Sequence, residues 1–286
     1  FHRDFMEYHQ DRFNDFSLMV FKDEKLVALL PANKVGAEIY SHQGLTYGGL
    51  LLLPNISSIK VFSMFETVCS YLKTQSIDHI YVKQVPSFYK SQASNEMSYQ
   101  LAKNGILDKR NMVLAIDYAK ELSIHKSKLK HYRKGLDLGL RVEENSDLDN
   151  FWNQILEPRL TLKYNTKPVH SLAEISKLAS CFPNNIKQFN VYYETELLAG
   201  ITIFETDFVV KSQYGATSNA GEKMRALDFL FVSLIYKYKE VGKQFFSMGT
   251  VSNNSKEGYH SGLLKQKEES SCQVYLQDYF KLKLND

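Results

Sequence analysis

Two stretches of the sequence follow the same plan and predict the fold. Residues 196–217 read ELLAGITIFETDFVVKSQYGAT, and residues 25–46 read KLVALLPANKVGAEIYSHQGLT. Each reads as an apolar strand, a short turn, a second strand and a Gly-x-Thr exit. The distance between Val27 and Gly44 is 17 positions, and a second pair of residues, Leu198 and Gly215, has the same spacing. We interpret the two stretches as copies of one unit.

Each copy continues into a helix and one further strand. After the first copy, apolar residues three and four positions apart predict a helix over residues 57–74, and a strand follows over 77–82. After the second copy, a similar stripe predicts a helix over 223–239 and a strand over 244–248. Both halves therefore have the order strand, strand, loop, helix, strand.

A basic segment joins the two halves. Residues 121–140 predict a helix that Gly135 or Gly139 would help to end. One face of this helix is basic, with residues Lys126, Lys130, Arg133 and Lys134. Such a face is either solvated or able to bind phosphate. We predict a first lobe over residues 1–120 and a second over 121–286, with further helices over 147–163 and 171–181.

Composition indicates a folded protein and bears on the cellular compartment in which we expect it to act. The 286 residues are 44% hydrophobic, which allows sizeable cores. The 35 basic and 32 acidic residues leave a net charge of +3, which does not by itself indicate nucleic-acid binding. There is no apolar run of about 20 residues, so we expect no membrane insertion. Three widely spaced cysteines lack metal-ligand spacing and suit a reducing cytoplasm, where we expect the protein to act.

The repeated order resembles that of the GNAT acyltransferase superfamily. Four stretches are more specifically similar to bacterial tandem-lobe GNAT proteins related to the FemAB peptidoglycan aminoacyltransferases, and they are residues 41–50, 126–139, 168–175 and 258–268. The resemblance covers nearly the whole chain. It implies an α/β (α+β) fold of two GNAT-like lobes, each a mixed, mostly antiparallel sheet flanked by helices.

Two departures from that group bear on the acyl donor. The peptidoglycan branch carries a long coiled-coil arm, and no long heptad run occurs here. The acyl-coenzyme A branch usually has Arg/Gln-x-x-Gly-x-Gly/Ala at its phosphate loop. The corresponding residues 213–222 contain glycines and small residues with a different spacing.

The expected chemistry is N-acyl transfer, which requires a positioned, deprotonated amine and a polarised carbonyl group. The sequence has no Gly-x-Ser-x-Gly elbow, His-Glu-x-x-His pair or Walker loop, so no metal is expected. The segment from Gly215 to Gly221, just before the helix over 223–239, is the predicted phosphate cradle, because a glycine-rich turn before a helix favours an anion. Its predicted cofactor-binding residues are Tyr214, Gly215, Ser218, Asn219 and Arg225. An ordinary strand-to-helix turn is the alternative.

Two residues are candidates for catalysis. His42 lies in a glycine-bearing loop and could act as a base if its pKa is near neutrality. Lys267 matches a strand lysine that, in the related family, binds substrate phosphate or stabilises the oxyanion. For these two the alternatives are a packed turn and a surface charge. Two polar loops supply the expected substrate-binding residues Gln43, Thr46, Tyr47, Asn253, Tyr259 and His260.

The sequence therefore predicts an N-acyltransferase. The expected donor is acetyl-coenzyme A or another acyl-coenzyme A, and the expected acceptor is an amino group of a small molecule, such as an amino sugar or amino acid in cell-envelope biosynthesis. Two alternatives stay open. One is transfer from an aminoacyl-tRNA, and the other is a catalytically silent tandem binding module. The second lobe is the expected site of the chemistry, and the sequence does not indicate an oligomeric state.

Overall fold

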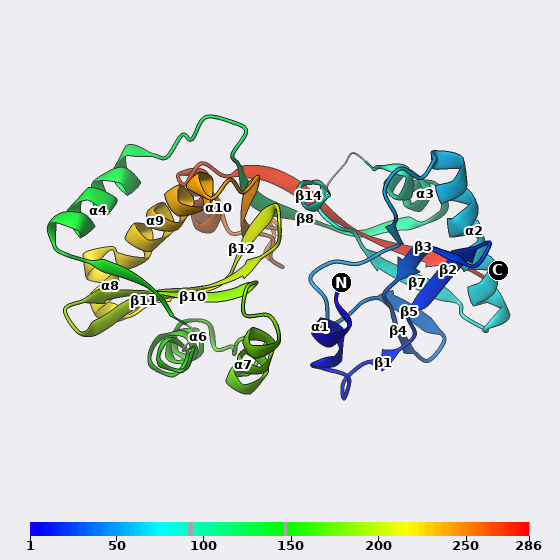
Figure 1. Ribbon diagram of the computed structural model, residues 1–286, viewed down its shortest axis with the longest axis horizontal. Coiled ribbons are helices and arrows are strands. Elements are labelled where there is room, and N and C mark those ends of the chain that lie inside the picture. The colour runs from blue at the N-terminus through cyan, green and yellow to red at the C-terminus, as the bar shows by residue number, and fades with distance from the viewer. Residues whose placement is uncertain (91–93, 146–147, 286) are drawn as a thin grey trace. The chain divides into compact units, whose positions relative to one another are not determined.

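The computed structural model describes residues 1–90, 94–145 and 148–285. The chain forms two compact units, of which one comprises residues 1–111 with 276–286 and the other residues 112–275 (Figure 1). The end of the chain thus belongs to the same unit as its beginning. Among the described residues, no helix has the length and apolar character needed to cross a bilayer.

The first unit contains a mixed sheet with strand order β1-β4-β5-β7-β14. Its strands are β1 (Asn14–Asp15), β4 (Asn33–Val35), β5 (Glu38–Ser41), β7 (His79–Lys83) and β14 (Gln273–Lys283). β5 and β7 are parallel, and α2 (Ser58–Thr74) connects them, while the other neighbours with a described register are antiparallel. The predicted apolar stripe of α2 is confirmed, because Val61, Phe65, Val68 and Leu72 are all buried.

A separate antiparallel sheet completes this unit, with β2 (Leu18–Lys22), β3 (Lys25–Leu30) and β6 (Leu51–Leu52). The remaining short helices are α1 (Arg3–Glu7), η1 (Ser87–Tyr89) and α3 (Glu96–Asn104). The core of the unit lies between α2 and the mixed sheet, where Phe65, Ile80 and Phe280 belong to one buried cluster.

The second unit contains a sheet in the order β8-β13-β12-β11-β10-β9. Its strands are β8 (Ile106–Asp117), β9 (Arg141–Asn145), β10 (Ile186–Tyr193), β11 (Glu196–Glu205), β12 (Val209–Thr217) and β13 (Phe245–Thr250). β12 and β13 are parallel, and the other neighbouring strands of this unit are antiparallel. This is the mixed, mostly antiparallel sheet that the sequence predicts.

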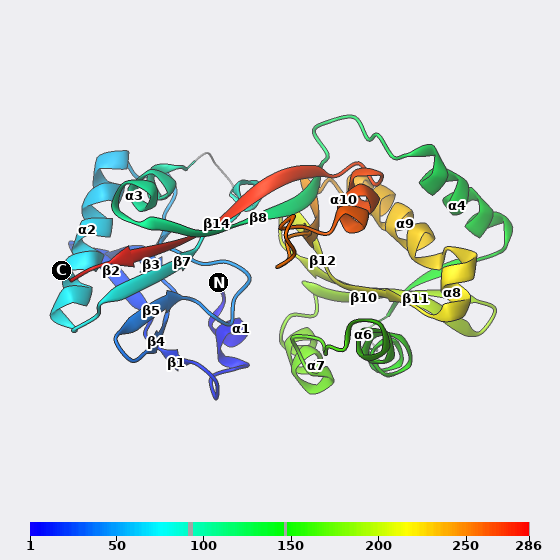
Figure 2. The same ribbon diagram turned by 180° about the vertical axis from the view of Figure 1, so that it is seen from behind.

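Helices cover both faces of the second sheet (Figures 1 and 2). On one face lie α4 (Lys126–Asp137) and α9 (Ala226–Glu240), and on the other lie α6 (Glu157–Tyr164) and α7 (Leu172–Cys181). The remaining elements are α5 (Asp149–Phe151), the π-helical turn η2 (Trp152–Leu156), α8 (Asn219–Met224) and α10 (Ser261–Glu268). In the α5–η2 segment, Phe151 and Trp152 are fully buried.

The repeated order is present in both units, with one change of strand. β4, β5, α2 and β7 of the first unit correspond to β11, β12, α9 and β13 of the second. The prediction that residues 25–32 supply the first strand of the first copy is wrong. That stretch forms β3 in the small sheet and stops at Leu30, because Pro31 has no N–H to continue a ladder.

Three local predictions also change. The predicted helix over residues 223–239 is two helices, α8 and α9, which join at Arg225 in a left-handed conformation (φ 58°). Gly139 (φ 76°) follows the end of α4, whereas Gly135 lies inside that helix against Phe229. The predicted strand around Lys267 is the helix α10, which the His260 side chain caps.

Candidate functional site

The parallel strands of the second unit separate after a short pairing. β12 and β13 are paired over three residue pairs, from Val209↔Phe245 to Lys211↔Ser247. Beyond a bulge, Gly249 and Thr250 of β13 are still paired with β8. Within the described chain, the edge of β12 from Ser212 to Thr217 therefore has no strand partner on that side. An open strand edge offers N–H and C=O groups to an extended ligand.

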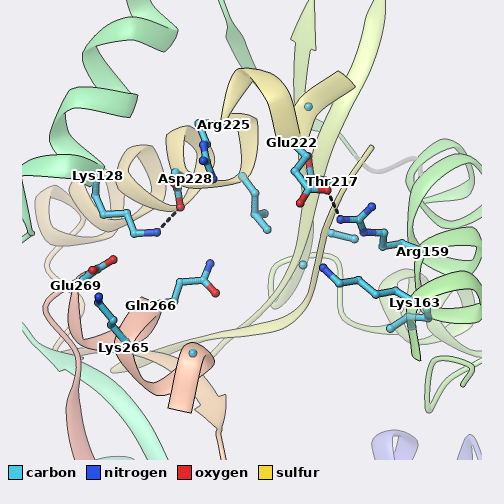
Figure 3. A pocket seen from close by; sticks show the side chains of 16 residues that line it. Lys128, Arg159, Lys163, Thr217, Glu222, Arg225, Asp228, Lys265, Gln266 and Glu269 are labelled. Atoms are coloured by element: carbon cyan, nitrogen blue, oxygen red, sulfur yellow. Dashed lines mark hydrogen bonds and ion pairs between the residues drawn. The ribbon is translucent and has the colours of Figure 1, made fainter. Parts of the chain in front are cut away.

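A pocket of about 560 Å³ lies along the end of this open edge. Gly215, Ala216 and Thr217 of β12 form part of its wall. The rest comes from α4, α6, the α8–α9 junction and α10 (Figure 3). These elements contribute Lys128, Arg159, Leu160, Lys163, Gly221, Glu222, Arg225, Leu227, Asp228, Gly262, Lys265, Gln266 and Glu269.

The lining of this pocket is basic. Five cationic side chains face three carboxylates, which leaves an excess of two positive charges. The cations are Lys128, Arg159, Lys163, Arg225 and Lys265, and they come from four different regions of the chain. Figure 3 shows Lys163 extending from α6 toward the side where α10 places Gln266. The pocket is therefore suited to an anionic ligand.

Two of these cations are held by carboxylates. Lys128 Nζ lies 2.5 Å from Asp228 Oδ1, and His131 Nδ1 lies 2.8 Å from the other oxygen of the same carboxylate. Arg159 pairs with Glu222 and also donates to Asn219 Oδ1 at 3.2 Å. The hydrogen bond from Arg159 lowers the pKa of Glu222. These contacts fix the positions of α4, α6 and α8 around the pocket.

Two other cations are not neutralised in this way. Among the described residues, neither Arg225 nor Lys265 forms an ion pair with a carboxylate. Arg225 occupies the left-handed turn between α8 and α9, and Lys265 lies on α10. Both side chains are exposed and therefore accessible to a ligand.

The predicted cofactor residues are divided between the pocket and its supports. Gly215 and Arg225 line the pocket. Ser218 caps α8 by accepting the N–H of Gly221 at 3.0 Å, and Asn219 holds Arg159. The Tyr214 hydroxyl instead lies 2.6 Å from His170 Nδ1. The sequence reasoning missed Lys128, Arg159, Lys163, Lys265 and Gln266, which no common motif connects.

Lys267 does not line this pocket, although its helix does. Its side chain is 6% exposed, and its ammonium group donates to the carbonyl oxygens of Gly249 (3.2 Å) and Thr250 (2.9 Å). Burial lowers the pKa of Lys267 to about 8. These two hydrogen bonds hold α10 against the end of β13.

The other candidates near α10 make local contacts. His260 Nδ1 accepts the N–H of Leu263 at 3.1 Å, and Asn253 Oδ1 accepts the N–H of Ser255 at 3.0 Å. Tyr259 is half-buried against the core of the second unit. They are not among the residues that line the pocket.

The remaining candidates lie in the first unit. The ring of His42 is buried and stacks on His9 with a centroid separation of 5.4 Å. Burial, with a smaller contribution from His9, lowers the pKa of His42 to about 4, so the expectation of a value near neutrality is wrong. Gln43 exchanges two hydrogen bonds with Asn33.

Two further candidates of the same loop have different environments. The Thr46 side chain is exposed, and its carbonyl oxygen accepts a hydrogen bond from Gln277 at 3.0 Å. The Tyr47 ring packs against Tyr89 at 4.6 Å, and burial raises the pKa of Tyr47 to about 12. Tyr47 is therefore protonated and acts as a packing group in this loop.

Comparisons with known proteins identify the fold. No protein-family model and no curated protein sequence matches the chain. Among solved structures, FemX matches with a TM-score of 0.72 and 12% identity over 99% of this chain and 91% of its own. The structure of L-PGS from Bacillus licheniformis matches with a TM-score of 0.64 and 13% identity, covering 100% of this chain and 93% of its own.

A third match carries the name of the superfamily. A tandem GNAT protein from the clavulanic acid biosynthesis pathway matches with a TM-score of 0.52 and 7% identity over 99% of this chain and 88% of its own. The chain thus has a tandem GNAT fold of the FemAB-like type, and the fold class inferred from the sequence is confirmed.

Proposed function

We propose that this chain is an N-acyltransferase that binds an acyl-coenzyme A donor in the basic pocket of the second unit. The observation that carries the proposal is that one pocket combines the open edge of β12 with cations that have no carboxylate partner. The open edge and the cations suit two different parts of such a donor.

The edge of β12 suits the extended, amide-containing arm of the donor. Backbone N–H and C=O groups between Ser212 and Thr217 can pair with that arm as with an added strand. An N–H on the same edge can also stabilise the negative charge that develops on the acyl oxygen during attack by an amine. In the reaction the amine nitrogen bonds to the acyl carbon, the carbon–sulfur bond breaks, and the proton that the amine loses ends on the departing thiolate, which gives free coenzyme A.

The cations suit the phosphates of the donor. The Arg225 guanidinium can hold two phosphate oxygens at once, and Lys265 provides a second positive charge. The tandem GNAT protein named above was solved in a form described as lacking AcCoA, which supports the same ligand class here. We further propose a small-molecule amine as the acceptor, an amino sugar or amino acid of envelope biosynthesis, and a cytoplasmic location.

A second donor, an aminoacyl-tRNA, is favoured by one surface feature. On α4, Lys128 lines the pocket. The same helix carries three exposed cations outside the pocket, which are Lys126, Lys130 and Arg133. Exposed cations on a helix beside a basic pocket can bind a nucleic-acid backbone.

Calorimetry separates the two donors. We expect acetyl-coenzyme A to bind, and Arg225→Ala or Lys265→Ala to weaken binding about tenfold each, because a charge-assisted hydrogen bond contributes about 1.5–3 kcal/mol. Lys126→Ala is the matched control, since this exposed lysine lies outside the pocket and should leave acetyl-coenzyme A affinity unchanged.

The same preparation is titrated with a short RNA hairpin that ends in a charged acceptor stem. RNA binding that falls in Lys126→Ala, without any binding of acetyl-coenzyme A at millimolar concentration, would replace the first donor by the second. Binding of neither ligand would overturn the assignment of a donor site. Binding of acetyl-coenzyme A without turnover of any amine in a broad panel would support the silent binding module.

A further inference from the structure

A cavity of about 390 Å³ lies in the first unit, at the carboxyl ends of β5 and β7. These two strands are parallel up to Ser41↔Val82, and the chain then leaves β5 to form the loop His42–Tyr47. Ligands often bind where parallel strands end in this way. The lining residues are Tyr40, Ser41, His42, Gln43, Tyr81, Val82, Lys83, Asp108, Tyr279 and Phe280.

The cavity contains a cation without a matching carboxylate. The Lys83 ammonium donates to the carbonyl oxygen of Leu45 at 3.2 Å and lies 5.7 Å from the centre of the Tyr279 ring. Within the described residues it forms no ion pair. Lys83 is partly buried, and this burial, together with the charge of Lys109, lowers the pKa of Lys83. A desolvated cation that is not neutralised favours a bound anion.

Two neighbouring side chains can donate to the same anion. Ser41 is 2% exposed, and its hydroxyl has no hydrogen-bond partner among the described residues. His42 Nδ1 accepts the backbone N–H of Gly44 at 3.2 Å. Since His42 is neutral at pH 7, its proton is on Nε2, which makes that atom a donor. The cavity wall thus carries an ammonium, a hydroxyl and an imidazole N–H.

Aromatic rings form the apolar part of the wall. Tyr40 and Tyr81 stack with a centroid separation of 4.6 Å and an interplanar angle of 6°. Both hydroxyls bond to the Glu38 carboxylate, at 2.5 and 3.1 Å, so the two rings are held in place. Tyr279 adds a third ring. Rings of this kind bind a flat or apolar ligand body.

One acidic residue limits the charge of the ligand. Asp108 is exposed and lines the same cavity. Its negative charge repels a dianion, such as a phosphate monoester, more strongly than it repels a single carboxylate. The attraction of the Lys83 ammonium can offset the weaker of these two repulsions. The combination favours a monoanion over a phosphate.

We propose that this cavity binds a small organic carboxylate, with the carboxylate at Lys83, Ser41 and His42 and a flat apolar body against Tyr81 and Tyr279. This ligand site is additional to the donor pocket of the second unit. It does not depend on the proposed acyl transfer, because every residue that defines it belongs to the first unit.

Titration calorimetry with three probes of one shape tests the proposal. The probes are benzoate, phenyl phosphate and benzylamine, which share the ring and differ in the charged group. We expect benzoate to bind at least about tenfold more tightly than the other two. Binding of benzoate should take up protons at alkaline pH, because the anion stabilises the charged form of Lys83, whose pKa burial lowers. The proton uptake is measured by comparing the binding enthalpy in buffers that differ in their enthalpy of ionisation.

Two variants locate the binding. Lys83→Met should weaken benzoate binding by a factor of about ten or more and abolish the proton uptake, and Ser41→Ala should weaken it by a smaller factor of about three. Ser41→Ala removes only the buried hydroxyl oxygen, so it can still test the site if Lys83→Met does not fold. Lys34→Met is the matched control, since Lys34 also lies over an aromatic ring of the first unit (Phe16, 5.3 Å) but does not line the cavity.

The outcomes are distinct from those of the donor test. Tighter binding of phenyl phosphate than of benzoate would replace the carboxylate by a phosphate and overturn the ligand class. Equal binding of all three probes, or benzoate binding unchanged in both Ser41→Ala and Lys83→Met, would overturn the site. Acetyl-coenzyme A affinity should be the same in Lys83→Met as in the wild type, so either proposal can fail alone.

Discussion

The carboxylate of Asp228 bonds to two side chains of α4, and its removal should destabilise the second unit. Asp228 lies in the first turn of α9 and bonds to Lys128 and His131 of α4. The side chains of Lys128 and Asp228 are only 9% and 12% exposed. Asp228→Asn keeps the shape of the side chain but leaves the Lys128 ammonium buried without a counter-charge.

The expected loss in the free energy of unfolding is large for so small a change of side chain. Removing one partner of a buried ion pair costs about 3–5 kcal/mol, and the residual exposure of Lys128 places this case near the lower end, at about 3 kcal/mol. Lys128→Met removes the stranded charge itself. The double variant Lys128→Met/Asp228→Asn should therefore be more stable than Asp228→Asn alone, although it contains one more substitution.

Urea unfolding followed by circular dichroism measures these differences. Glu222→Gln is the matched control, because it removes another pocket carboxylate that pairs with a cation, Arg159, at an exposed site where ion pairs contribute little. A double variant no more stable than Asp228→Asn would show that Lys128 is not left as an uncompensated buried charge. A loss in Glu222→Gln as large as that in Asp228→Asn would also show that burial is not the cause.

Three further outcomes are expected. In the wild type, the folded state loses the Lys267 proton near pH 8 and the unfolded state near 10.5, so the destabilisation by this buried cation is relieved between these values. Lys267→Met should lack this rise in stability, and parallel urea titrations at pH 7.5 and 10 would contradict the assignment if both proteins changed alike. Gly135→Ala should lower the unfolding free energy by about 1 kcal/mol in a thermal melt, because a Cβ would lie 2.5 Å from the Phe229 ring and overpacking outweighs the gain in helix propensity. A thiol reagent should label exposed Cys181 in the folded protein and reach buried Cys272, whose pKa burial raises to about 12, only after unfolding; early loss of the Cys272 thiol would contradict this.

Local pattern predicted the elements well and the chemistry of single side chains poorly. The apolar stripe of α2, for example, depends on residues three and four positions apart. Lys267 was placed on a strand, whereas the cap at His260 begins a helix there. The pKa of His42 depends on burial and on His9, which lies 33 positions away in the sequence. Contacts of that kind have no local signature.

The sequence alone determined that two halves share one order of strands and helices, because the spacing of apolar residues records which face of each element is buried. The sequence also placed Gly215 and Arg225 in the same predicted site, since they are only ten positions apart in the chain. The packing of the helices in three dimensions brings Arg159, Lys163 and Lys265 to the same pocket. Charged side chains on separate helices leave no periodic pattern, and their meeting depends on how α6 and α10 pack around the end of β12. The same holds for Lys83 and Ser41, which become neighbours because parallel strands end side by side.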